Sequence, residues 1–233
     1  WLQGFNHTRS DQDWEDICIQ IPGPETAKIG AFAKKHQVYV AGAAFERDPD
    51  WPEVWFTTGF ILGPSGEVEL RYRKIHEHNL EGLIPNVSPA DVLTDYTSRY
   101  GEDSLFPVLD TPYGRLAMMV EHDMNFFELS RVLTFHGAEI LLHPTAEWNG
   151  PMVHTLDQAR RSRAYENFIY LASANAGAIV SKYSAAQASR GCSTVINYLG
   201  NVESAIDGAG ESILVSSIDL DRLRKRRTEV FMN

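Results

Sequence analysis

A stretch of three polar residues, Glu121 to Asp123, directly follows an apolar run from Leu116 to Val120. The run has the length of a strand that is buried on both faces. Apolar residues then recur at helical spacing from Phe127 until Gly137. A strand, a sharp polar turn and a helix form the elbow with which many enzymes present a nucleophile to backbone N–H groups. Glu121 occupies this turn with a carboxylate, where a hydroxyl or a thiol would be expected, and a carboxylate there could act as a general base.

Lys74 is the second candidate, because it follows a predicted strand and opens a long connection from His76 to Thr111. Taken alone, it is typical of an exposed lysine at a strand end. Beside a carboxylate, it could stabilise a developing oxyanion. An acid that ends a buried strand needs a partner, so Lys74 is the candidate partner of Glu121. Glu81 lies in the same connection and by itself is typical of a solvated loop acid.

Three further residues could contact a substrate. His122 lies in the elbow, His143 ends a predicted strand that begins at Ala138, and Trp148 follows it. The alternative for His143 and Trp148 is packing within the core. A metal site is not expected, because adjacent residues of an extended chain point to opposite sides and cannot all reach one ion. The sequence also lacks the His-x-x-x-His and Cys-x-x-Cys patterns of metal sites.

Other catalytic patterns are not supported by the residues around them in the sequence. Cys192 has no histidine or acid near it in the sequence, which favours a small buried residue over a nucleophile. No serine lies in a Gly-x-Ser-x-Gly frame. The glycines at Gly208 and Gly210 precede a predicted strand rather than a helix, so a nucleotide-binding loop is not indicated. No cofactor is therefore expected. The two cysteines, Cys18 and Cys192, do not suggest a disulfide scaffold.

Composition excludes several classes of partner. The 233 residues carry a formal charge of −10 and are 43% hydrophobic. Nucleic acid and anionic membrane are unexpected partners, because binding to either begins with a cationic surface. The basic cluster from Arg222 to Arg227 is interpreted as a solvated tail or contact segment. No apolar run is long enough to span a bilayer. The start at Trp1 does not resemble a signal peptide, and without an initiator Met the chain is expected to begin within a longer protein. A cytoplasmic location is expected.

The remaining pattern predicts alternating strands and helices in one domain covering residues 1–233, an α/β fold with a mixed sheet. Two helices are expected, over 24–36 and over 157–171, besides the one that follows the elbow. The other strands are expected at 38–45, 54–62, 67–72, 138–142, 170–174, 192–198, 202–205 and 213–218.

The order of these motifs resembles the nitrilase (carbon–nitrogen hydrolase) superfamily over nearly the whole chain. The resemblance implies a four-layer α-β-β-α sandwich and a homodimer or larger homo-oligomer. It also implies a Glu–Lys–Cys site that hydrolyses nonpeptide C–N bonds of small amides, carbamoyl compounds or nitriles. The matching segments are 21–24, 62–67, 72–76, 114–117, 123–128, 137–142, 163–167 and 199–202.

Only part of the family site carries over to this sequence. Lys74 matches the family lysine, and Glu81 resembles a second glutamate that positions the substrate. The first family glutamate would precede Trp1, so we expect the chain to lack that residue and the first strand of the family. The position of the family cysteine is held by Glu121, a far poorer nucleophile, which would also pair with Lys74.

This departure predicts the loss of thiol catalysis and leaves three hypotheses. Glu121 could activate water as a general base, with Lys74 as the electrophile. The chain could instead be a pseudoenzyme that binds a ligand or builds an assembly. Finally, Glu121 could differ from the natural residue of an ordinary amidase. The connection 76–111 is expected to cover the pocket and to set its specificity, but the sequence does not identify the substrate.

Overall fold

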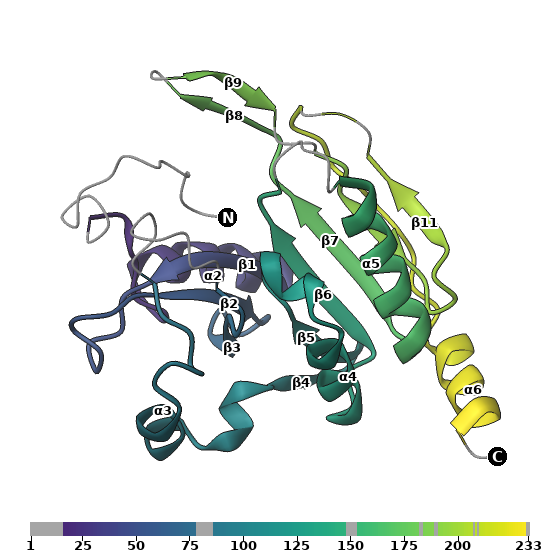
Figure 1. The fold of residues 1–233 in the computed structure, drawn as a ribbon, viewed down its shortest axis with the longest axis horizontal. Helices are drawn as coiled ribbons and strands as arrows, with labels where there is room; N and C mark the ends of the chain where they lie inside the picture. Colours follow the sequence, from purple (N-terminus) through teal and green to yellow (C-terminus); the bar gives the residue numbers. More distant parts are fainter. Residues whose placement is uncertain are drawn as a thin grey trace. The chain divides into compact units, whose positions relative to one another are not determined.

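The computed structural model describes residues 16–77, 86–147, 153–181, 184–188, 191–206, 208 and 210–231. The chain divides into two compact units, Trp1–Pro107 (unit 1) and Val108–Asn233 (unit 2). Each unit has its own sheet, with elements labelled in Figure 1. The prediction of a single domain over residues 1–233, without the first strand of the family, stays a prediction.

Unit 1 is built on a three-stranded antiparallel sheet with strand order β1-β2-β3. The hairpin predicted around Gly63 to Gly66 is confirmed, because β2 and β3 pair on either side of this turn. β2 is buried along its whole length, as its apolar sequence indicates. The elements of the unit up to this point are α2 (Pro24–His36), β1 (Val40–Glu46), β2 (Phe56–Leu62) and β3 (Val68–Arg73).

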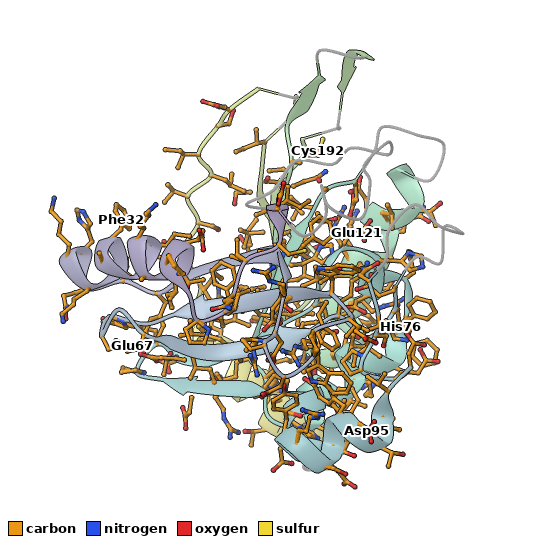
Figure 2. The ribbon with its side chains drawn as sticks, turned by 90° about the vertical axis from the view of Figure 1, so that its left-hand side faces the viewer. Phe32, Glu67, His76, Asp95, Glu121 and Cys192 are labelled. Carbon is orange, nitrogen blue, oxygen red and sulfur yellow. The ribbon has the colours of Figure 1, made fainter. Side chains whose placement is uncertain are left out.

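Helix α2 packs against this sheet through its small residues. It begins at Pro24, whose fixed backbone suits the first position of a helix. Ala33 forms one apolar cluster with Ala44 and Phe60 of the strands. Phe32 lies on the opposite side of the helix with 55% of its surface exposed (Figure 2). The helix predicted over 24–36 is confirmed.

The connection 76–111 contains regular structure that the sequence pattern did not predict. It includes α3 (Leu93–Tyr100), the short 3₁₀ helix η1 (Glu102–Leu105) and β4 (Val108–Thr111), which belongs to unit 2. Tyr96 of α3 is buried and meets the ring of Phe56 edge-on, with 6.3 Å between ring centroids. Tyr100 of the same helix packs against Tyr96, with 5.0 Å between ring centroids, so two aromatic residues anchor α3.

Unit 2 contains a six-stranded mixed sheet with strand order β11-β10-β7-β6-β5-β4. Its three central strands, β5, β6 and β7, are parallel, so their carboxyl ends lie along one edge of the sheet. The strands are β4, β5 (Gly114–Met118), β6 (Ile140–Thr145), β7 (Tyr170–Asn175), β10 (Thr194–Ile196) and β11 (Val202–Ala205).

Helices α4 (Phe127–Phe135) and α5 (Val153–Asn167) follow β5 and β6 and lie side by side against the sheet (Figure 1). α5 ends four residues before the predicted end of its helix. Phe168 there adopts a left-handed backbone with φ of 47°, and the Ile169 N–H returns to the Ala164 carbonyl. These features are typical of a helix C-terminus, which the apolar pattern alone could not place.

Three features of unit 2 differ from the predictions. The predicted strand 213–218 is not among the described strands: its backbone pairs with no strand in the described residues, and Ile213 is 91% exposed. A hairpin of β8 (Ala178–Ser181) and β9 (Ser184–Ala188) was not predicted. The basic cluster over 222–227, interpreted as a solvated tail or contact segment, lies in helix α6 (Leu220–Phe231), which was not predicted. Arg224 of this helix makes a contact by donating twice to Glu139.

None of the helices in the described part of the chain combines the length and the apolar sequence that a membrane crossing requires.

Candidate functional site

The elbow of unit 2 has the predicted strand, turn and helix. The chain leaves β5, and Met119 donates its N–H to the Leu142 carbonyl of the neighbouring strand at 3.1 Å. Residues Glu121–Asn125 then form the 3₁₀ turn η2, which leads into α4. Glu121 has a left-handed backbone with φ of 47°. This conformation is unfavourable for a residue with a Cβ, so contacts with the surrounding residues must stabilise it.

Asp123 closes this turn with its side chain and its backbone. Its Oδ2 accepts the Val120 N–H at 3.1 Å, and its own N–H donates to the Val120 carbonyl at 3.2 Å. The residue is fully buried. Asp123 therefore acts as a structural residue of the elbow, and its carboxylate is directed at the backbone.

His143 supports the elbow from β6. Its Nε2 lies 3.0 Å from the Glu121 carbonyl oxygen, and its Nδ1 lies 3.0 Å from Ser173 Oγ on β7. Only 1% of His143 and 4% of Ser173 are exposed. Both ring nitrogens thus have partners within the protein, and the predicted contact of His143 with substrate stays a prediction.

His122 is half-buried and lies one residue after Glu121. Its Nδ1 is 2.8 Å from the amide nitrogen of Asn125, and its ring meets Phe126 edge-on. Because an amide NH₂ can only donate, Nδ1 is the acceptor and the neutral ring carries its proton on Nε2. His122 keeps its place as a candidate for substrate contact, since it shares the turn with Glu121.

A buried ion pair, which the sequence analysis did not predict, lies beyond the carboxyl end of β6. Glu147 accepts a hydrogen bond from Arg160 of α5, which also donates to Asp157 at 3.0 Å. Arg160 is 1% exposed and Glu147 is 8% exposed. The Glu147 N–H donates to Asn175 Oδ1 at the end of β7. Acidic or amide side chains therefore lie at or just beyond the carboxyl ends of all three parallel strands, at Glu121, Glu147 and Asn175.

Lys74 of unit 1 lies immediately after β3 and is buried, with 3% of its surface exposed. Its backbone N–H donates to the Thr57 carbonyl at 2.8 Å. Its ammonium group forms an ion pair with Glu77, with Nζ and Oε2 separated by 3.0 Å. The reading of Lys74 as an exposed lysine is therefore wrong, and Glu77 is a partner that the sequence analysis missed.

A second ionic group fixes the residue before Lys74. Arg73 is fully buried and donates to both carboxylate oxygens of Glu46 at 2.9 Å. It also donates to Asp48, and its guanidinium carbon lies 4.1 Å from the centroid of Phe56. Tyr100 donates to the same Asp48 carboxylate at 2.8 Å.

The charges of this group support one another. Burial opposes the charge of Arg73, but the hydrogen bonds to Glu46 and Asp48 outweigh burial and raise the pKa of Arg73 above its ordinary value. Burial would likewise raise the pKa of Asp48. The hydrogen bonds that Asp48 accepts from Arg73, the Asp50 N–H and Tyr100 reverse this effect and lower its pKa. Arg73 and Asp48 therefore both favour their charged forms.

The structure brings only some of the predicted residues together. Glu121, His122 and His143 lie at the elbow of unit 2, whereas Lys74 belongs to unit 1, so its pairing with Glu121 stays a prediction. Glu81 and Trp148 lie outside the described residues. Cys18 and Cys192 are not joined in a disulfide. Within the described part of the chain, no cluster of three or more His, Cys, Asp or Glu residues could hold a metal ion.

Comparison with known proteins gives a family and a fold. A sequence model for the family described as carbon–nitrogen hydrolase matches residues 1–228. The chain is 29% identical to the omega-amidase NIT2 of Homo sapiens over 228 residues, which cover 97% of this chain and 78% of that protein. It is 28% identical to the omega-amidase NIT2 of Mus musculus with the same coverage.

Solved structures show the same fold. A carbon–nitrogen hydrolase from Helicobacter pylori G27 superposes with a TM-score of 0.78 at 22% identity, covering 96% of this chain and 76% of that one. Nit3 of Saccharomyces cerevisiae, a member of branch 10 of the nitrilase superfamily, superposes with a TM-score of 0.75 at 21% identity, covering 95% and 76%. The predicted fold class, the α/β sandwich of nitrilase type, is confirmed.

Proposed function

Because the chain belongs to the carbon–nitrogen hydrolase family, we propose that it acts on a nonpeptide C–N bond of a small amide, carbamoyl compound or nitrile without covalent thiol catalysis. Glu121 takes the position of the family cysteine by resemblance. Lys74 and Glu81 keep the oxyanion-stabilising and substrate-positioning roles that the resemblance gives them. Relatives named omega-amidase support amides as the first substrates to test.

In this proposal the Glu121 carboxylate is a general base. It removes a proton from water, and the hydroxide oxygen bonds to the carbonyl carbon of the amide. The ammonium group of Lys74 stabilises the negative charge on the carbonyl oxygen. The tetrahedral intermediate then breaks its C–N bond, and the leaving amine receives the proton from Glu121. The net reaction consumes one water and gives a carboxylic acid and an amine.

The geometry of the elbow is the observation that supports this role most directly. Glu121 is half-buried, and its left-handed backbone is fixed at the start of a 3₁₀ turn that leads into α4. By resemblance, this is the position of the family nucleophile, and an elbow directs one side chain away from the edge of the sheet. A carboxylate so placed is suited to water activation, since it is a weak nucleophile and an effective base.

The test is ammonia release from a panel of small amides, carbamoyl compounds and nitriles. We expect Glu121→Gln to lower kcat by about 10²-fold or more, because the amide cannot accept the proton from water. The matched control is Glu128→Gln, which changes an exposed acid in the first turn of α4. That variant should retain the turnover of the unmodified protein within about twofold, as is typical of surface substitutions.

Two outcomes would contradict the proposal. Turnover that survives Glu121→Gln would show that this carboxylate is not the base. Absence of turnover in the unmodified protein, with hydrolysis gained on Glu121→Cys, would show a retained pocket in a protein that has lost its chemistry. The second outcome identifies a pseudoenzyme.

The ion pair at Lys74 is the observation that favours this second candidate, a non-catalytic nitrilase-fold protein. Glu77 accepts from the Lys74 ammonium group at 3.0 Å, and both side chains are largely buried. A carboxylate this close offsets the positive charge that a developing oxyanion would need. If the unmodified protein binds an amide in equilibrium dialysis yet releases no ammonia, the non-catalytic candidate holds.

A homo-oligomer is also part of the proposal. Three aromatic residues of α4 and α5 are largely exposed in unit 2, with Phe127 at 52%, Phe135 at 76% and Tyr165 at 59%. They support a contact between copies of this chain through the helical face. Light scattering after size exclusion should show a dimer or a larger assembly, and Phe135→Asp should shift it toward the monomer. A cytoplasmic location stays a prediction.

A further inference from the structure

We propose that His143 is a positioning residue of the elbow, and that its hydrogen bond to the Glu121 carbonyl holds residue 121 in the left-handed conformation that aims its side chain. The link to catalysis depends on the proposed function. The geometric part does not, because it concerns the backbone of Glu121 and the state of one imidazole ring.

The contacts come from three neighbouring strands. His143 lies within β6, where it pairs in register with Ser173 of β7. Its Nε2 reaches the Glu121 carbonyl beyond the end of β5 at 3.0 Å, and its Nδ1 contacts Ser173 Oγ at 3.0 Å. With 1% of its surface exposed, the ring is enclosed by the protein. The elbow is therefore attached to the adjacent strand by a side chain as well as by the sheet.

The donor and acceptor roles follow from the partners. A carbonyl oxygen can only accept, so Nε2 must carry a proton. A hydroxyl can donate or accept, so Ser173 donates to Nδ1 when the ring is neutral. Ser173 thereby selects the tautomer that Glu121 requires, in the way that the second partner of a histidine commonly sets its tautomer.

The bond matters because Glu121 has a left-handed backbone, which is less favourable for a residue with a Cβ than for glycine. With this φ of 47°, the Glu121 carbonyl oxygen lies 3.0 Å from His143 Nε2 on β6. If the carbonyl loses its donor, the peptide can relax to an ordinary conformation, and the side chain of residue 121 then points elsewhere. His143 therefore acts on the chemistry through Glu121 and needs no contact with the substrate.

The first test uses ¹⁵N NMR of the histidine side chains in the unmodified protein. The His143 signals, identified by their loss in His143→Gln, should show a proton on Nε2 and none on Nδ1 above neutral pH. Ser173→Ala should weaken this preference, because it removes the donor to Nδ1. A neutral ring with its proton on Nδ1 would overturn the proposal.

The second test measures the orientation of the side chain at position 121 through the alkylation rate of a thiol placed there. The thiol is introduced by Glu121→Cys in a Cys192→Ser background, and its alkylation by iodoacetamide is followed by peptide mass spectrometry. Adding His143→Leu should slow alkylation about 10-fold, because a displaced group loses its orientation and its backbone N–H neighbours. Adding His143→Gln should largely preserve the rate, since its amide can still donate to the carbonyl.

The matched control is Thr145→Val, on the same strand and equally buried at 1% exposure. Its hydroxyl contacts Glu147 rather than the elbow, so alkylation should be unchanged. Equal rates for His143→Leu and Thr145→Val, with unchanged circular dichroism, would overturn the proposal. If His143→Leu does not fold, the NMR result decides. Neither test requires turnover, so a failure of hydrolysis would remove the proposed function and leave this inference standing.

Discussion

Lys74 in unit 1 and Glu121 in unit 2 are held by different kinds of interaction. The neighbourhood of Lys74 is ionic: its ammonium group pairs with Glu77, and the preceding Arg73 pairs with Glu46 and Asp48. Glu121 is held through its backbone, by a left-handed φ and by the bond that its carbonyl accepts from His143.

The difference between these ionic and backbone contacts affects how a site residue can be replaced. An elbow that is fixed through backbone atoms places whatever side chain stands at position 121, so a carboxylate fits there as readily as a thiol would. A lysine that is fixed through a local carboxylate depends on the side chains around it. We therefore expect substitutions in unit 1 to affect stability through charge, and substitutions at the elbow to affect it through conformation.

The largest effect is expected at Arg73. Arg73→Met leaves Glu46 and Asp48 buried without their main cation, and should lower the free energy of unfolding by about 3–5 kcal/mol. The control is Arg71→Met, because Arg71 also donates to Glu46 at 3.0 Å but keeps 29% of its side chain exposed. It should cost only about 1 kcal/mol. Urea unfolding measures both, and equal losses would contradict the ionic account of unit 1.

A smaller gain is expected at the elbow. Glu121→Gly removes the Cβ that disfavours a left-handed backbone, and should raise the free energy of unfolding by about 1 kcal/mol. Glu128→Gly, inside α4, should lower it by about 1 kcal/mol, because glycine is a poor helix former. Urea unfolding of the pair provides the comparison. A loss of stability for both variants would show that Glu121 is not strained.

The smallest effect concerns an ion pair of unit 2 that is partly open to solvent. The hydrogen bonds from Arg224 lower the pKa of Glu139 from its ordinary value of 4.5, against the opposing effect of burial. Because Arg224 is 53% exposed, Glu139→Gln should cost only about 0.5 kcal/mol at pH 7.

The direction with pH follows from the lowered pKa. The folded protein binds the Glu139 proton less tightly than the unfolded chain, so the stabilisation is present above pH 4.5 and is lost as the pH falls through the folded pKa. Unfolding of the unmodified protein and of Glu139→Gln should therefore converge in acid. A difference that grows below pH 4.5 would contradict this account.

Local patterns allowed much of the fold to be predicted from the sequence. The apolar run before Glu121 and the helical spacing after it indicated the elbow, and the turn at Gly63 to Gly66 indicated its hairpin. The helix over 220–231 was not predicted, because its anchor is the contact between Arg224 and Glu139, which lie 85 positions apart. The strand predicted over 213–218 begins with three apolar residues, Ile213 to Val215, but an apolar run does not supply a neighbouring strand.

The candidate site divides in the same way. Residue type and local spacing are enough to show which side chains stand at positions 74 and 121. They are also enough to show that position 121 follows a strand and precedes a helix. Only the tertiary structure decided that Glu77 pairs with Lys74, and that His143 and Ser173, 30 positions apart, support Glu121. Hydrogen bonds and ion pairs depend on where side chains meet after the strands have aligned. The spacing of residues along the chain does not specify these meeting points.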